Sequence, residues 1–374
     1  EYKDEMMKYG KAGDDEKYAF YHKRQLVQKI LLNSLYGVLG LPAFRFYDVD
    51  NATAVTTTGQ TVIKSTADMA NIKYNKELGT PDLDSNIYID TDSVFFSAVP
   101  LMEKRFPNWK DEEQDTIAGY VNDIATEMQD YLNDFYDILS KKIFNVDKDK
   151  HRLEIKKEYV AKAGLWIAKK RYAQWIISDN GVPCDKLDVK GLDVKRSSFP
   201  KAFQECMGKV LIDILKGKTE VEISDYVLDF KKNMINRPTS EIAKNSAVKN
   251  LKKYMPKGKR VPFTMMKGTP AHVKAAILYN DCLKHFEAPF KYEPLKNGDK
   301  VKWVYLKDNP LGIDGLAFTG YKDPPEIEEF INTYINHDKI FERELKHKLQ
   351  DFYDAIGWGE VVSEQRTAEK FFSF

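Results

Sequence analysis

Two aspartates one residue apart, Asp90 and Asp92, stand between two short apolar segments of this chain. The segments Asn86–Ile89 and Val94–Ala98 are rich in β-branched and aromatic residues, which favour β-strands. Four polar residues separate them, so the sequence predicts a tight antiparallel hairpin. Because residues two apart on an extended strand face the same side, we expect both carboxylates to converge on one point beyond the sheet.

Such a pair of carboxylates favours a bound divalent cation. Close carboxylates without a counter-charge repel each other, and a divalent ion relieves that repulsion. Magnesium takes oxygen ligands from one or two carboxylates and fills its other positions with water and substrate phosphates. The alternative is a solvated Asp-Thr-Asp turn without a ligand, and this segment taken alone favours that alternative.

A long helix is predicted upstream, from Asp14 to Leu39, where the chain has no proline and Gly37 is its only glycine. On a 3.6-residue period, five polar or aromatic side chains of this helix share roughly 80° of arc, while apolar residues and Ser34 occupy the other sides. Lysine holds phosphate oxygens, and a tyrosine ring can lie against a base or sugar. This face predicts a binding surface for a nucleoside triphosphate. The alternative is a solvated helix face without a ligand. The five residues are His22, Gln25, Lys29, Asn33 and Tyr36.

The rest of the pattern predicts an α+β fold of two to three domains in 374 residues. In 112–143, apolar residues recur with a helical period, which indicates packing against a sheet. Asp179-Asn180-Gly181 is a hairpin signal. Further helices are expected over 1–9 and 51–78, a turn over 10–13, and strands over 153–159, 165–167, 171–177 and 301–306.

Composition limits the possible partners. No apolar run approaches the ~18 residues that a membrane span needs, so no membrane partner is expected. Three scattered cysteines, Cys184, Cys206 and Cys282, favour reduced thiols in a cytoplasmic compartment. The formal net charge is +1, so any contact with nucleic acid must come from local basic patches. Two such stretches run over 150–171 and 231–267. Trp166, Tyr172 and Trp175 lie in or beside the first, which favours a surface that follows a nucleic-acid backbone. For the second, an ordinary solvated surface is an equal alternative.

Three motifs together resemble those of family B DNA polymerases. Lys29-x-x-x-Asn33-Ser34-x-Tyr36-Gly37 is similar to the family's motif B, and Asp90-Thr91-Asp92-Ser93 to its motif C. Lys169-Lys170-Arg171-Tyr172 is similar to its lysine-rich palm motif. Segments over 44–60 and 197–201 resemble the T-even phage branch. The resemblance implies part of the fingers over 1–48, a palm with an antiparallel sheet backed by helices over 49–200, and a mainly helical thumb over 201–360.

The implied reaction is template-directed transfer of a nucleotide from a deoxynucleoside triphosphate (dNTP) to a primer 3′-hydroxyl, with two Mg²⁺ ions. By this resemblance Asp92 is the direct ligand of both metals and Asp90 supports it. Lys29 and Lys3 would bind the triphosphate, and Asn33 and Tyr36 would check the base pair from the minor groove. The residues expected to bind primer–template DNA are Lys169, Lys170, Arg171, Tyr172, His272 and Lys274.

One part of the family's metal site has no counterpart here. The first catalytic aspartate of the family lies in a motif ending in Ser-Leu-Tyr-Pro, which this sequence lacks. The proofreading exonuclease of the family also lies N-terminal to the fingers. We therefore expect that the chain begins inside the fingers, is inactive alone, and needs an N-terminal polymerase half as partner.

The last residues, 361–374, resemble a peptide that binds a sliding clamp. Such peptides place a glutamine before an aliphatic residue and two aromatics, here Gln365, Ala368, Phe371 and Phe372. Exposed phenylalanines at a chain end are expected to fill a pocket of a partner. The alternative is a tail folded back on the thumb.

Two other functions remain open at this level. The chain could be a non-catalytic, clamp-tethered DNA-binding subunit that retains a polymerase fold. It could also be another palm-type nucleotidyltransferase, such as a reverse transcriptase or an RNA polymerase. Those enzymes usually carry adjacent aspartates in the turn, unlike Asp90-Thr91-Asp92, and lack the Lys29–Gly37 motif.

Overall fold

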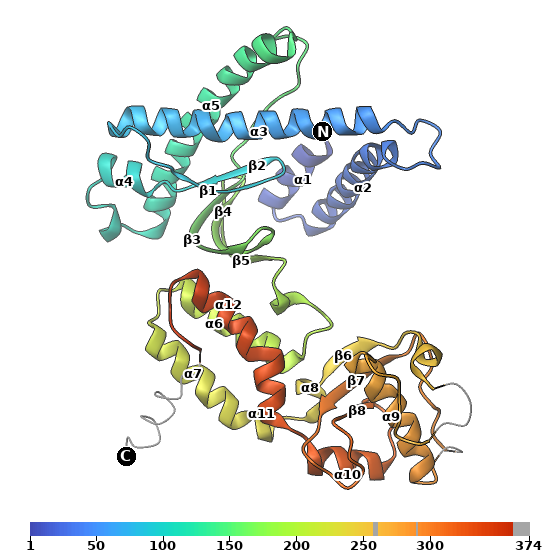
Figure 1. The fold of residues 1–374 in the computed structure, drawn as a ribbon. Helices are drawn as coiled ribbons and strands as arrows, with labels where there is room; N and C mark the ends of the chain where they lie inside the picture. The colour runs from blue at the N-terminus through green and yellow to red at the C-terminus, as the bar shows by residue number, and fades with distance from the viewer. Residues whose placement is uncertain (257–260, 289–290, 362–374) are drawn as a thin grey trace. The chain divides into compact units, whose positions relative to one another are not determined.

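Helices and small antiparallel sheets make up this chain in a computed structural model, which describes residues 1–256, 261–288 and 291–361 (Figure 1). The predicted α+β class is confirmed. The chain divides into two compact units. The first comprises residues 1–162 and 176–186, and the second comprises 163–175 and 187–374. Each unit is described below by itself.

The first unit is built on long helices whose ends follow from local sequence. The predicted helix over 14–39 is confirmed as α2, because Asp14 caps it by accepting the amide of Lys17. Asp48 caps α3 in the same way, and Gly79, with φ of 77°, ends it. The helices predicted over 1–9, 51–78 and 112–143 are also present. The bounds are α1 Tyr2–Lys11, α2 Asp15–Leu39, α3 Val49–Leu78, α4 Val99–Arg105 and α5 Gln114–Phe144.

A hydrophobic core joins α3, α4 and α5. The predicted apolar stripe of α5 is buried here, with Ile124, Met128 and Leu132 at most 3% exposed, but it packs mainly against helices and not, as predicted, against a sheet. They pack with Tyr74 of α3 and with α4, and Phe96 of the hairpin lies at the edge of this core. Figure 1 shows the hairpin lying along α3, and both of its strands contact that helix. The core therefore fixes the platform from which the hairpin projects.

Arg105 ties the same three helices together electrostatically. Its guanidinium donates to Glu77 at 2.6 and 2.9 Å and to Glu127 at 2.7 and 3.0 Å. Hydrogen bonding from Arg105 lowers the pKa of both carboxyl groups, so each is ionised at neutral pH. Paired hydrogen bonds between a guanidinium and carboxylates are among the stronger polar contacts in proteins.

We expect Arg105→Ala to lower the free energy of unfolding of the first unit by about 2 kcal/mol, since it leaves two carboxylates without their cation. Urea denaturation followed by circular dichroism measures this change. The matched control is Lys110→Ala, because Lys110 and Glu103 form an ion pair at 3.3 Å whose side chains are 67% and 55% exposed. An exposed pair of this kind contributes about 0–1 kcal/mol. Equal losses of unfolding free energy in the two variants would contradict the role assigned to Arg105.

A three-stranded sheet follows, in the order β3-β4-β5. The hairpin signal Asp179-Asn180-Gly181 is confirmed, since Asn180 and Gly181 have φ of 50° and 77°, as a two-residue type I′ turn requires. The strand predicted over 153–159 is wrong. Of this segment, only Tyr159 belongs to a strand. The reason is that side chains of α5, and not a neighbouring strand, form hydrogen bonds with its backbone. Asn133 and Gln129 accept the amides of Ile155 and Lys157. The bounds are β3 Tyr159–Ala168, β4 Arg171–Asp179 and β5 Val182–Lys190.

The second unit combines helices with a second three-stranded antiparallel sheet, in the order β6-β7-β8. The strand predicted over 301–306 is confirmed as β7, and its two neighbours were not predicted. Helix α9 packs against β8, and Trp303, Val304 and Leu316 are buried in the core of this unit. The strands are β6 Lys244–Ala247, β7 Lys300–Tyr305 and β8 Gly315–Phe318. The α-helices are α6 Lys201–Leu215, α7 Glu220–Asn233, α8 Thr239–Ile242, α9 Ala271–His285, α10 Pro325–Tyr334, α11 His337–Ile340 and α12 His347–Ala355.

Candidate active site

The hairpin of β1 (Asn86–Asp90) and β2 (Ser93–Phe96) carries the two aspartates at its tip. The predicted antiparallel hairpin is confirmed, with Ile89 opposite Val94 and Asp90 opposite Ser93. The expected geometry of the tip is wrong in one respect. The chain is not extended through Thr91, which has φ of 57°, and the amide of Asp92 donates to the carbonyl of Asp90 at 2.7 Å. The two carboxylates are therefore placed by a tight turn and not by the alternation of a strand.

The turn gives the two aspartates different surroundings. Asp90 ends β1 and is half-buried, and its Oδ1 accepts the hydroxyl of Thr91 at 3.0 Å. The hydroxyl of Ser93 donates to the carbonyl of Asp90 at 3.1 Å, which closes the turn. Asp92 is exposed at the tip. Asp92 is thus the more accessible of the two carboxylates.

The two carboxylates at this tip supply only some of the ligands that a magnesium ion requires. Among the described residues, no group of three or more His, Cys, Asp or Glu side chains is arranged to hold a metal ion. Two carboxylates at a surface turn match an ion that keeps several water and phosphate ligands of its own. Asp92 and Asp90 are the residues that would hold it, together with ligands from outside these residues.

Helix α2 presents the predicted polar face to solvent. Gln25 is half-buried, and His22, Lys29, Asn33 and Tyr36 are exposed. The apolar residues on its other sides are exposed as well, and Val27, Leu31 and Leu32 are 62%, 64% and 66% exposed. No residue of this 25-residue helix is buried. Exposed apolar residues therefore flank the polar face of this helix.

Helix α1 packs beside the start of α2 and places Lys3. Tyr9 stacks on Tyr21 with ring centroids 5.5 Å apart, which joins the two helices on either side of the turn predicted over 10–13. The Lys3 ammonium lies 3.5 Å from a carboxylate oxygen of Glu158, and both side chains are about half exposed. Exposed pairs of this kind are weak, so the Lys3 cation is available to an anionic ligand.

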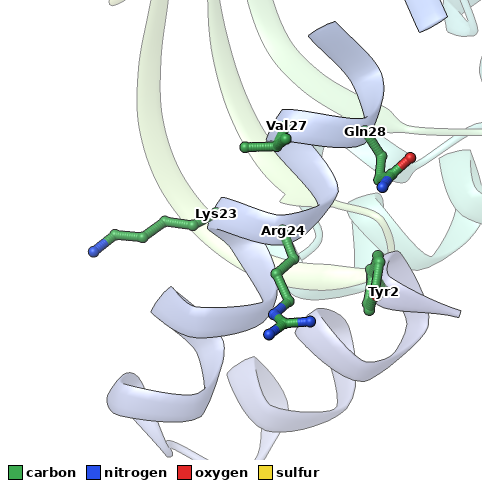
Figure 2. A pocket seen from close by; sticks show the side chains of 5 residues that line it. All are labelled: Tyr2, Lys23, Arg24, Val27 and Gln28. Atoms are coloured by element: carbon green, nitrogen blue, oxygen red, sulfur yellow. The ribbon is translucent and has the colours of Figure 1, made fainter. Parts of the chain in front are cut away.

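A pocket of about 230 Å³ lies between α1 and α2, on the face of α2 opposite to the predicted stripe (Figure 2). It is lined by Tyr2, Lys23, Arg24, Val27 and Gln28. Figure 2 shows Arg24 reaching toward Tyr2, while Lys23 extends away. Sequence reasoning did not select these residues, although the adjacent cations Lys23 and Arg24 are a visible signal. None of the predicted nucleotide-binding residues lines this pocket.

The lysine-rich motif falls on the turn between β3 and β4. Lys169 and Lys170 form this turn and are exposed, which suits a contact with phosphates. Arg171 instead forms an ion pair with Asp351 at 2.8 Å. Tyr172 is 7% exposed and its ring stacks on Trp166, with centroids 6.4 Å apart. Lys169 and Lys170 are thus exposed at the turn, whereas Arg171 is paired with Asp351 and Tyr172 is buried beside Trp166.

His272 and Lys274 lie in the first turn of α9. His272 is half-buried, and this burial, together with the charge of Lys244, lowers the pKa of its imidazole below the usual value. The Lys274 ammonium lies 2.7 Å from Asp314. His272 is therefore neutral at pH 7, and Lys274 is partly engaged. The predicted clamp-binding residues Gln365, Ala368, Phe371 and Phe372 lie outside the described residues.

Across the described residues, no helix is long and apolar enough to span a membrane.

Comparisons with known proteins identify relatives along most of this chain. Residues 1–354 match the family model described as DNA polymerase family B. The DNA-directed DNA polymerase of Enterobacteria phage T4 is 28% identical over 350 residues, which cover 89% of this chain and 37% of the relative. That of Escherichia phage RB69 is 28% identical over 347 residues, covering 88% and 37%. The mouse DNA polymerase alpha catalytic subunit is 25% identical over 324 residues, covering 84% and 18%. The chain thus spans just over a third of the length of its phage relatives.

Proposed function

Since this chain belongs to DNA polymerase family B and resembles its T-even phage members, we propose that it is the C-terminal catalytic portion of a replicative DNA polymerase. It would transfer a nucleotide from a dNTP to the 3′-hydroxyl of a primer on a template. The observation that carries this proposal is the turn with Asp90 and an exposed Asp92, in one compact unit with the exposed cation Lys29. The hairpin and α2 both contact α3, which places them on one support.

In this proposal Asp92 and Asp90 hold two magnesium ions together with a carboxylate from outside the chain. Ions held by these residues would supply stabilisation of the attacking and leaving oxygens of an in-line displacement. Asp92 is assigned the direct contact, because it is exposed at the tip. Asp90 is assigned a supporting role, because one of its oxygens already accepts the hydroxyl of Thr91.

The proposed nucleotide contacts lie on the fingers hairpin, α1 and α2. Lys29 and Lys3 would hold the triphosphate and offset the charge of the leaving pyrophosphate. Asn33 and Tyr36 follow Lys29 by one and two turns on the same face, so they would meet the nascent base pair. The minor groove presents acceptors at similar places in every correct pair, so contacts there test geometry and not sequence.

Primer–template DNA is the second proposed ligand. The exposed turn of Lys169 and Lys170 would bind backbone phosphates, and such contacts position a duplex without reading its sequence. His272 and Lys274 are proposed as further contacts on α9. A neutral His272 would act as a hydrogen-bonding group and not as a cation.

An N-terminal polymerase half is proposed as the protein partner. The phage relatives are longer than the segment matched here, and the motif ending in Ser-Leu-Tyr-Pro is absent from the chain. The exposed apolar residues of α2, which include Val27, Leu31 and Leu32, are the surface that this partner would cover. The tail with Phe371 and Phe372 is proposed to bind a sliding clamp. A cytoplasmic location is proposed from the free thiols of Cys184, Cys206 and Cys282.

Lys29→Ala tests the assignment of the triphosphate contact. In primer extension with the N-terminal half present, we expect the KM for dNTP to rise about 100-fold, roughly 3 kcal/mol, because a charge-assisted contact to phosphate is lost. The KM of Lys29→Arg should lie between those of Lys29→Ala and the unaltered chain.

The matched control for Lys29→Ala is Lys23→Ala, which removes the same charge from the opposite face of α2. We expect its KM to change less than threefold. A larger effect at Lys23 than at Lys29 would assign the triphosphate to the pocket beside Tyr2 and would contradict the proposed face.

A further inference from the structure

The turn with Lys169 and Lys170 is held by an ion pair with a distant part of the chain. Arg171, the first residue of β4, donates from a terminal guanidinium nitrogen to Oδ2 of Asp351 at 2.8 Å. Asp351 lies on α12, 180 positions further along the sequence. The two side chains are only 31% and 36% exposed. One terminal nitrogen of this guanidinium is therefore engaged within the protein, so an external phosphate would have to compete with Asp351 for it.

A second ion pair fixes the same helix to the segment that follows β5. Lys348 lies 2.8 Å from one carboxylate oxygen of Asp193, and Arg196 lies 2.9 Å from the other. The side chain of Asp193 is only 8% exposed. Lys348 and Asp351 are three residues apart on α12, so both project from one side of it. That side of α12 is therefore anchored at two points within the second unit.

Gly191 allows the turn to lie close to this segment. Its φ is 65°, and a Cβ at this position would lie 2.0 Å from the carbonyl oxygen of Lys170 and 3.4 Å from Cγ of Arg171. Any larger residue would push the turn away. Lys170 itself has φ of 61°, a conformation that a residue with a Cβ adopts when its surroundings hold it there. Gly191 and the Arg171–Asp351 pair are such surroundings.

We propose that Arg171 and Asp351 are positioning residues whose ion pair holds the Lys169–Lys170 turn in the conformation that presents its lysines to the phosphates of a nucleic-acid duplex. This inference rests on the proposed function of the two lysines. It assigns Asp351, an acidic residue far away in sequence, a favourable role in binding a polyanion. The competing assignment makes Arg171 itself a phosphate contact.

The two assignments predict opposite changes in DNA affinity for Asp351→Asn. If Arg171 contacts phosphate directly, neutralising Asp351 frees that cation and removes a negative charge near the DNA, so binding becomes tighter. If the pair positions the turn, the same substitution weakens binding, because the lysines lose their fixed placement. The test is fluorescence anisotropy of a labelled primer–template duplex with the full 374-residue chain, at several salt concentrations.

We expect Asp351→Asn and Arg171→Met each to weaken duplex binding about tenfold, with a flatter slope of log K against log salt concentration. The double variant should be no weaker than either single variant, since both remove one interaction. Arg171→Lys should retain binding, because the ammonium can still pair with Asp351. Asp354→Asn is the matched control, since it removes an exposed acid from the same helix. It should leave affinity unchanged or raise it slightly.

Tighter or unchanged binding by Asp351→Asn would overturn the inference. Thermal melting of each variant identifies loss of fold, and binding is compared below the lowest melting temperature. If Asp351→Asn does not fold, Asp351→Ser replaces it, because serine also removes the charge that pairs with Arg171. Weaker binding by this variant is expected, and tighter or unchanged binding overturns the inference. Lys169→Ala with Lys170→Ala tests the proposed function separately, and unchanged binding there would reject the turn as a DNA contact.

Discussion

Nucleotide incorporation is expected to be absent from the 374-residue chain alone and to return when the N-terminal polymerase half is added. The reason is the number of carboxylates. The tip of the hairpin offers Asp90 and Asp92, while the resemblance to family B implies a further catalytic aspartate in a motif ending in Ser-Leu-Tyr-Pro, which this sequence lacks. A pair of metal ions that clamps both the attacking and the leaving oxygens needs further ligands. Extension of a labelled primer with Mg²⁺ and dNTP, with and without the second polypeptide, measures the difference.

Duplex binding is the control for this experiment. The chain alone should still bind primer–template DNA, because Lys169 and Lys170 are exposed independently of the metal site. Robust extension by the chain alone would show that the metal site is assigned wrongly. Binding that persists without any gain in extension on adding the N-terminal half would favour a non-catalytic DNA-binding subunit. Loss of binding would count against both functions.

Local signals in the sequence predict the first unit well. The bounds of α2 follow from a side-chain cap at Asp14 and from an uninterrupted helical stretch, and both are readable over a few residues. The β1–β2 hairpin and the turn at Asn180 and Gly181 are predicted for the same reason. Each of these features is decided by neighbours in the sequence, so a single sequence contains the required information.

Long-range contacts, and in one turn the local backbone conformation, decide the features that the sequence does not reveal. Residues over 153–158 have the composition of a strand, yet Asn133 and Gln129 of α5 bind their backbone groups. Arg171 has the sequence context of a phosphate contact, but its partner Asp351 is 180 positions away. At the hairpin tip, the left-handed conformation of Thr91 replaces the extended geometry that alternation implies. In each case a tertiary or backbone constraint overrides the local pattern.

Asp92→Asn should produce the largest loss among single substitutions at the proposed site. Asparagine preserves the shape of the side chain and removes the charge that a metal ion requires. In the presence of the N-terminal half, we expect kcat to fall by about 10³-fold or more, roughly 4 kcal/mol in the activation free energy. Duplex affinity should change little, because Asp92 is not among the proposed DNA contacts. Single-turnover primer extension separates the chemical step from binding.

Two further aspartates make this prediction specific. Asp90→Asn should lower kcat less than Asp92→Asn does, because Asp90 is half-buried and accepts a hydrogen bond from Thr91. Asp82→Asn is the matched control. Asp82 is an exposed aspartate in the loop before β1, so its substitution removes the same charge from the same unit. Its kcat should stay within about twofold of the unaltered chain, as a screened surface charge has little effect. An equal loss at Asp82 and Asp92 would mean that net charge, and not metal ligation at the turn, governs the rate.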